Sequence, residues 1–236
     1  MSAVDQVITV TCKEIREIVT NRGLAFSGIF FAGWFSVMTG LGIADGDIAG
    51  RAQLDNSLFY MGALIGLFVG YIYSGQTYLR EKQSGIVETL LCAPISLRRL
   101  WIGKAIGVAV PSTMLSWLSA LSIILIANHR VGGEMMPSAQ VSVYILAVLP
   151  IFIVAAIALI GFGQLMLGMR ENMIVNMATI MILFGALAAT RLIVEEADFV
   201  TWGAVGGIAT ASVILLLLIS FLGRYLSRER IVRTIS

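Results

Sequence analysis

Long apolar stretches separated by short polar segments make up most of this sequence. Six of them reach the length of about 20 residues that a helix needs to cross the hydrocarbon core of a bilayer. They cover residues 24–44, 57–79, 104–127, 141–168, 173–193 and 200–224. These runs lack strand-like alternation, and in lipid a helix satisfies its own backbone hydrogen bonds. The pattern predicts an all-α integral membrane protein with six transmembrane helices, forming a single domain over residues 1–236.

A two-sided pattern precedes the first apolar stretch. One stripe at helical spacing consists of Val4, Val7, Ile8, Thr11, Ile15, Ile18 and Val19. The other face carries Lys13, Glu14, Arg16 and Glu17. This segregation predicts an amphipathic helix over residues 1–23 that lies at the membrane surface. The alternative is a solvated leader in which the periodicity arises by chance.

The polar segment between the second and third stretches also has helical periodicity. Its apolar face consists of Ile86, Val87, Leu90 and Leu91, and its second face of Glu81, Ser84, Gly85 and Glu88. Pro94 ends the helix, because it lacks an amide hydrogen and disfavours the helical conformation in the residue before it. The pattern predicts a short helix over residues 80–94, suited to contact with another protein. A surface helix that only packs beneath the bundle is the alternative.

Composition points to a membrane environment. Apolar residues make up 58% of the chain and charged residues 13%, and the mean hydropathy is +0.92. Soluble domains are about a quarter charged, so a soluble enzyme and a disordered chain are excluded. The net charge of +2 gives no indication of a nucleic-acid partner. Cys12 and Cys92 form neither a disulfide framework nor a CxxC pair.

The distribution of basic residues predicts the orientation. Thirteen of the 16 Lys and Arg residues lie before the first stretch, between the second and third, between the fourth and fifth, or around the tail. The positive-inside rule therefore predicts that both termini, the segment 80–94 and the basic tail 225–236 lie in the cytoplasm. We expect a multi-pass protein of the cytoplasmic (inner) membrane of a prokaryote. The first 22 residues lack the apolar core of a signal peptide.

Motifs for nucleotide binding and catalysis do not occur in the sequence. It contains no GxxxxGK[ST] phosphate loop, no HExxH and no GxSxG. The one histidine, His129, lies in a predicted external loop. No charged residue lies near the middle of a predicted span, where ion-driven transporters need one. We therefore expect no catalytic residue, no metal site and no cofactor site in this chain.

Small and polar residues form stripes within the predicted spans. Gly62, Gly66, Gly70 and Ser74 repeat every four residues, which predicts a groove for close helix packing, either within the chain or in a dimer. Hydroxyl and amide side chains share helix faces at Ser112, Ser116 and Ser119, and at Asn172, Asn176 and Thr179. These predict hydrogen bonds between helices or, as the sharper alternative, the lining of a substrate pathway.

One part of the sequence resembles a known family. The run Glu81-x-x-x-Gly85-x-x-Glu88-x-Leu90-Leu91-x-x-Pro94-Ile95-Ser96, followed by Gly103-Lys104, is similar to the first cytoplasmic loop of type-2 permeases of ATP-binding-cassette (ABC) exporters. The amphipathic segment with Lys13-Glu14-Ile15-Arg16-Glu17 and the six spans are similar too. Ile86 stands where the family often has Thr, and residues 194–199 are shorter than the family's usual segment before the last span.

The resemblance implies a partner and a mechanism. In that family the loop is a coupling helix that docks in a cleft of the ATPase subunit. The resemblance implies this contact for Glu81, Gly85, Ile86, Val87, Glu88, Leu90, Leu91 and Pro94. It further implies a permease subunit that exports a substrate with two copies of a separately encoded ATPase, which bind ATP and Mg, and that pairs with a second identical or homologous permease. The alternatives are an ATP-independent secondary transporter or channel, an integral membrane enzyme, and a non-transporting membrane scaffold.

Overall fold

The computed structural model describes residues 3–43, 47–85, 96–132, 135–167 and 200–225, and six single positions between 174 and 185. Within these residues every regular element is a helix and no strand occurs. The elements are α1 (Ala3–Thr20), α2 (Arg22–Gly42), α3 (Asp47–Ser74), the π-helical η1 (Gly75–Arg80), α4 (Glu81–Gln83), α6 (Leu97–Val131), α7 (Ala139–Val143), the π-helical η2 (Tyr144–Val148), α8 (Leu149–Met166), α10 (Trp202–Leu222) and the 3₁₀ turn η3 (Gly223–Tyr225).

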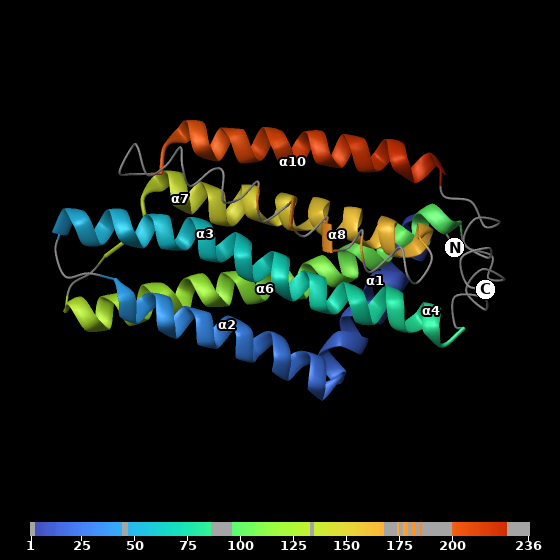
Figure 1. The fold of residues 1–236 in the computed structure, drawn as a ribbon, viewed down its shortest axis with the longest axis horizontal. Helices are drawn as coiled ribbons and strands as arrows, with labels where there is room; N and C mark the ends of the chain where they lie inside the picture. Colours follow the sequence, from blue (N-terminus) through green and yellow to red (C-terminus); the bar gives the residue numbers. More distant parts are fainter. Residues whose placement is uncertain are drawn as a thin grey trace.

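Among the described residues, five helical stretches are long and apolar enough to cross a membrane, and they run side by side along the long axis of the molecule (Figure 1). They are Arg22–Gly42, Gly50–Gln83, Leu97–Val131, Ala139–Met166 and Trp202–Leu222. The prediction of an all-helical chain with membrane-spanning helices is confirmed for these five. The predicted fifth span, 173–193, lies mostly outside the described residues, and its six described positions are helical and exposed.

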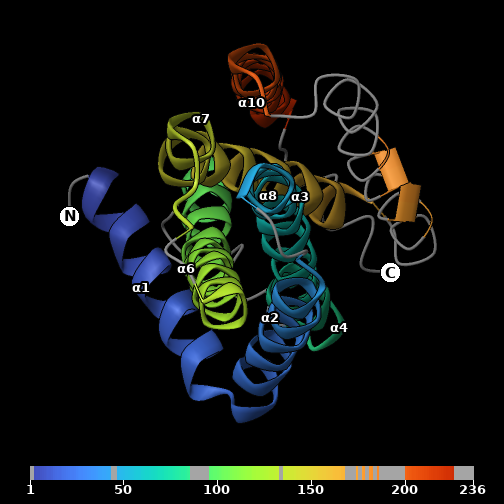
Figure 2. The same cartoon turned by 90° about the vertical axis from the view of Figure 1, so that its left-hand side faces the viewer.

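The bundle is arranged around α6. This helix contacts α1, α2, α3 and α8, and α10 packs on α8. Figure 2, which looks along the bundle, shows α2 and α10 on opposite sides of this centre. The colours of Figure 1 show that α8 and α10 run in the same direction.

The small residues of α3 are covered within the chain. A Cβ atom at Gly70 would lie 2.6 Å from Ile157 Cδ1 of α8, and one at Gly62 would lie 3.2 Å from Leu149 Cδ2. Further along the same face, Ser74 donates a hydrogen bond of 2.9 Å to Gln164 Oε1 of α8. In this chain the groove formed by Gly62, Gly66, Gly70 and Ser74 is therefore filled by α8, with α6 beside it.

Two helix ends differ from the hydropathy pattern. The second crossing helix continues through η1 and α4 to Gln83, and Gly85 follows with φ 72°, a left-handed conformation that suits glycine. Residues 80–83, expected to open the helix 80–94, are thus the end of the second crossing helix. Likewise α6 begins at Leu97, where Ser96 Oγ accepts from Arg99 N, whereas hydropathy placed the third span from residue 104. Hydropathy marks the apolar extent of a helix, whereas capping groups determine where the helix ends.

Candidate functional site

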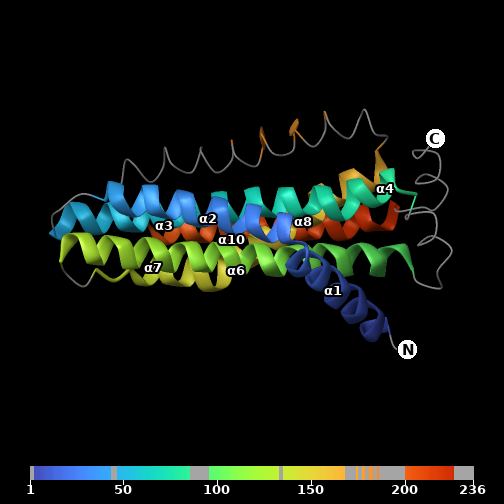
Figure 3. The ribbon, with the colours of Figure 1, turned by 90° about the horizontal axis from the view of Figure 1, so that it is seen from below.

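At one end of the bundle α1 crosses α6 and slants away from the other helices (Figure 3). Two glycines one turn apart in α6 permit this close approach. A Cβ atom at Gly103 would lie 2.8 Å from Val10 Cβ, and one at Gly107 would lie 2.6 Å from Glu14 Cβ. The face of α1 that is buried here consists of Val10, Glu14 and Ile18, at helical spacing of four residues.

Two polar contacts fix α1 on α6. Thr11 Oγ1 donates a hydrogen bond of 3.1 Å to the carbonyl oxygen of Gly103. Near the start of α6, Arg99 donates a hydrogen bond of 2.9 Å to Gln6 Oε1. The position of α1 along α6 is therefore determined by directional bonds as well as by apolar packing.

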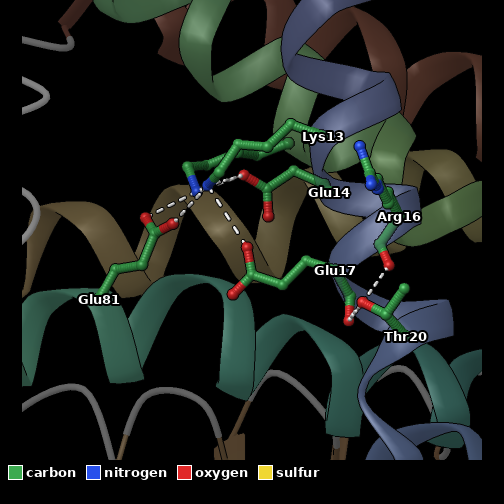
Figure 4. Close-up of polar contacts among 7 residues, drawn as sticks. Lys13, Glu14, Arg16, Glu17, Thr20 and Glu81 are labelled. Atoms are coloured by element: carbon green, nitrogen blue, oxygen red, sulfur yellow. Dashed lines mark hydrogen bonds and ion pairs between the residues drawn. The ribbon is translucent and has the colours of Figure 1, made fainter.

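Charged side chains from three elements meet where α1 crosses. We call the set of Lys13, Glu14, Glu17, Glu81 and Lys104 the α1 junction. Lys104 Nζ of α6 lies 2.9 Å from Glu14 Oε1 of α1 and 2.6 Å from Glu81 Oε2 of α4. Lys13 Nζ lies 3.1 Å from Glu14 Oε1, 3.2 Å from Glu81 Oε1 and 3.5 Å from Glu17 Oε2 (Figure 4).

Three members of the α1 junction are buried charges. Glu14 is 1% exposed, Lys104 2% and Glu81 7%. Removing an ion from water costs several kcal/mol, and this cost is offset only when partners lie at hydrogen-bond distance, as they do here. The ring of Tyr78 adds a further contact, since its centroid lies 5.8 Å from Lys104 Nζ.

Lys13 is half-exposed, as is Glu17, whereas the other three members are buried. Partial burial by itself lowers the pKa of Lys13, but the neighbouring carboxylates Glu14 and Glu81 raise it, by charge and by hydrogen bonding. The net effect holds the pKa of Lys13 above its ordinary value, so this lysine stays protonated at neutral pH.

The same end of the bundle is tied to α8. Lys82 Nζ donates a hydrogen bond of 2.6 Å to the carbonyl oxygen of Leu167, just past the last residue of α8. A lysine suits this position, because the final carbonyl groups of a helix lack partners and carry partial negative charge. Trp101 Nε1 of α6 donates to the carbonyl oxygen of Ala158 at 3.2 Å. Together with the α1 junction, these bonds connect α1, α4, α6 and α8.

The carboxylates of the α1 junction are already bound by cationic side chains of the chain. Carboxylate oxygens of Glu14, Glu17 and Glu81 lie within 4.8 Å of one another, a spacing at which carboxylates can hold a metal ion. Lys13 Nζ contacts all three carboxylates, so an ammonium group already provides the positive charge that a metal ion would bring. The arrangement is suited to holding three helical elements in a fixed relation.

Two of the residues assigned to an ATPase contact lie within the described part of the chain. Glu81 is bound inside the chain by Lys13 and Lys104, and Gly85 is the positive-φ residue after α4. The other assigned residues lie outside the described residues; these are Ile86, Val87, Glu88, Leu90, Leu91 and Pro94.

The serine stripe of α6 contributes to contacts between helices. Ser116 donates a hydrogen bond of 2.6 Å to the carbonyl oxygen of Gly62 on α3, and Ser119 Oγ lies 2.6 Å from Ser36 Oγ on α2. Ser112 donates to Val108 O within α6 at 2.8 Å. All three serines of the stripe are buried. The second predicted polar stripe, on the fifth predicted span, lies outside the described residues; it consists of Asn172, Asn176 and Thr179.

Sequence reasoning missed the central pair of the α1 junction. It placed Glu14 on the polar face of a surface helix, whereas the structure buries Glu14 against α6, and this expectation is corrected. It treated Lys104 only as the start of a span. One feature of the sequence could have indicated this pair, namely a lysine directly before a long apolar run. Such a lysine enters the bundle and therefore needs a carboxylate as a partner.

Among known proteins, no family model matches the sequence and the search of curated proteins finds no match. Any assignment of function therefore rests on the residues and contacts of this chain.

Proposed function

We propose that this chain is the membrane-spanning permease subunit of an ABC transporter. ATP hydrolysis in a separately encoded subunit, present in two copies, would drive export of a substrate through a pair of such permeases. The observation that carries the proposal is the position of the α1 junction. The segment that resembles a coupling helix begins beside Glu81 and returns to the bundle at Ser96, eight residues before Lys104. One end thus contains Glu81, and the other leads into the helix that carries its ion-pair partner Lys104.

In this proposal the two parts of the segment, Glu81 at its base and the residues after Gly85, have different roles. Glu88, Leu90 and Leu91 contact the ATPase subunit, as the resemblance implies. Glu81 positions the base of the segment, because its carboxylate is bound by Lys104 inside the chain. ATP and Mg bind to the partner, since the sequence has no phosphate-binding loop.

The α1 junction supports a mechanical path from the segment to the bundle. Glu81 lies in the last turn of the second crossing helix and Ser96 caps the third, so movement of the segment acts on both helices. Lys104 binds Glu14 as well as Glu81, which extends the path to α1. To convert a population from mostly one state to mostly the other, ATP-driven contacts must favour the second state by about 5.5 kcal/mol.

The orientation follows from charge in the same proposal. The end of the bundle that carries the α1 junction also carries Arg98 and Arg99 at the start of α6. The positive-inside rule supports placing this end, and both termini, in the cytoplasm of a prokaryote.

Co-purification with an ATPase tests the proposal. The chain is tagged, extracted from native membranes in mild detergent and assayed for associated ATP hydrolysis. We expect a co-purifying subunit with a GxxxxGK[ST] loop. We expect Leu90→Arg to release it, because a charge in an apolar contact disrupts docking.

Gln83→Arg is the matched control, because Gln83 is exposed at the base of the same segment and belongs to neither of its two predicted faces. This variant should retain the ATPase subunit. Isolation of the chain without any nucleotide-binding subunit, under several mild detergents, would overturn the proposal and favour an ATP-independent transporter or channel.

A further inference from the structure

A second feature of the same end of the molecule is an apolar groove between α6, α8 and α10. Its volume is about 180 Å³. The walls consist of Ile102 and Ile106 of α6, Val154 and Ala158 of α8, and Leu216 and Ile219 of α10. The indole of Trp101, which is 2% exposed, completes the inner wall. None of these side chains belongs to the α1 junction.

The groove has the dimensions and polarity for hydrocarbon. An engineered apolar cavity of about 150 Å³ holds one benzene molecule. By this comparison the groove accommodates about six carbon atoms of a straight or bent hydrocarbon chain. Apolar walls bind apolar matter, and a water molecule there would lack polar partners. The adjoining outer face of α10 exposes Leu217 and Leu218, which is the side that faces acyl chains in a membrane.

A cation and a hydroxyl group mark one end of the groove. Arg98, in the first turn of α6, and Ser220, in the last turn of α10, both line it. The guanidinium of Arg98 donates a hydrogen bond of 3.3 Å to Ser220 Oγ. Among the described residues it forms no ion pair with a carboxylate, unlike Lys13 and Lys104. Its charge therefore remains available to an anion.

We propose that this groove is a binding site for one anionic phospholipid of the surrounding membrane. The lipid phosphate binds Arg98 beside Ser220, and an acyl chain lies between Ile106, Val154 and Leu216. Charge complementarity identifies the occupant: the apolar groove ends at an arginine that pairs with no carboxylate of the described residues, and this matches a hydrocarbon chain that ends at a phosphate. The site is separate from the proposed ATPase contact, and its test does not depend on transport.

Fluorescence of Trp101 tests the site. A variant that keeps Trp101 as its sole tryptophan is made by replacing Trp34, Trp117 and Trp202 with Phe. It is reconstituted in phosphatidylcholine vesicles that contain increasing fractions of phosphatidylglycerol with brominated acyl chains. Because Trp101 lines the groove and is otherwise enclosed, bromine quenches it most strongly from within the groove.

We expect quenching that saturates at a low fraction of brominated phosphatidylglycerol. Brominated phosphatidylcholine should require about fivefold more lipid for the same effect, which corresponds to about 1 kcal/mol for one arginine near an anionic lipid. Arg98→Gln should remove this preference. Arg22→Gln, at an exposed arginine at the start of α2, should retain it.

A second variant tests the apolar part of the site without altering charge. Val154→Phe fills the groove from α8 and should reduce quenching by both lipids, while circular dichroism shows that the helices are retained. Equal quenching by the two lipids, or a preference that survives Arg98→Gln, would overturn the proposal. Absence of quenching by either lipid would also overturn it, and would indicate that the groove is filled by protein.

Discussion

Lys104 determines the electrostatics of the α1 junction, because it is the one buried cation that bridges Glu14 and Glu81. Lys13 reaches the same two carboxylates from the surface, with about half of its side chain exposed (52%). The two lysines therefore have similar partners but different surroundings. A buried ion pair that loses one partner leaves an uncompensated charge in low dielectric, whereas an exposed pair is replaced by water.

We expect Lys104→Met to lower the free energy of unfolding by about 3 kcal/mol, because Glu14 and Glu81 lose their buried cation. Lys13→Met should cost less than about 1 kcal/mol, since water replaces a half-exposed ammonium. Thermal unfolding followed by intrinsic fluorescence in one detergent measures both. Equal losses for the two lysines would contradict the assignment of Lys104 as the central residue of the α1 junction.

At the scale of elements, the crossing of α1 over α6 depends on two residues without side chains. Gly103 and Gly107 bring the helix backbones close enough for Lys104, which lies between them, to reach Glu14. At Gly107 the obstacle would be Glu14 Cβ and the carbonyl oxygen of Thr11, neither of which moves without the backbone. The contact between these helices thus tolerates no side chain at this position.

We expect Gly107→Ala to displace α1 and to cost about 1 to 3 kcal/mol, the range for overpacking in a close contact. Cleavage by trypsin after Lys13 or Arg16 should become faster, because displaced helices open more often. Gly33→Ala in α2 is the control, since a Cβ atom there meets nothing within 4 Å. It should leave cleavage unchanged and stabilise α2 slightly, because alanine favours a helix over glycine. If Gly107→Ala is cleaved no faster than the unaltered protein, the position of α1 does not depend on its close contact with Gly107.

The sequence predicted the helices well and their contacts poorly, for a physical reason. Apolar runs report burial in lipid or protein, so they located all five described crossing helices. Helical periodicity shows only which residues of α1 share a face of that helix. The burial of Glu14 depends on Lys104, which lies 90 residues later in the sequence. Similarly, Gly62 and Gly70 were recognised as a small-residue face, but only the structure identifies Leu149 and Ile157 as the side chains that fill it.

At the scale of the whole molecule, the direction of each helix sets which loops share a side of the membrane. Gln83, at the end of α4, lies at the same end of the bundle as the start of α6. Arg130, near the end of α6, and Thr201, before α10, lie at the opposite end (Figure 1). Because α8 and α10 run in the same direction, Thr201 shares its side with Arg130 and not with Gln83.

Single cysteines at Gln83, Arg130 and Thr201, in a background with Cys12 and Cys92 replaced by serine, test this topology. A maleimide that cannot cross the membrane, added to intact cells, should label Arg130→Cys and Thr201→Cys. Gln83→Cys should react only after the cells are permeabilised, since the positive-inside rule predicts that the α1 junction faces the cytoplasm. Labelling of Thr201→Cys together with Gln83→Cys would contradict the shared direction of α8 and α10.

The separation of 90 residues between Glu14 and Lys104 also constrains the order in which the molecule is assembled. A ribosome adds about 5 to 20 residues per second, so roughly 5 to 20 s pass between the synthesis of the carboxylate and that of its lysine. During this interval α1 is complete but α6 does not yet exist. The first helix to be made therefore cannot take its place until α6 has been made, and until then Glu14 depends on water at the membrane surface for its solvation.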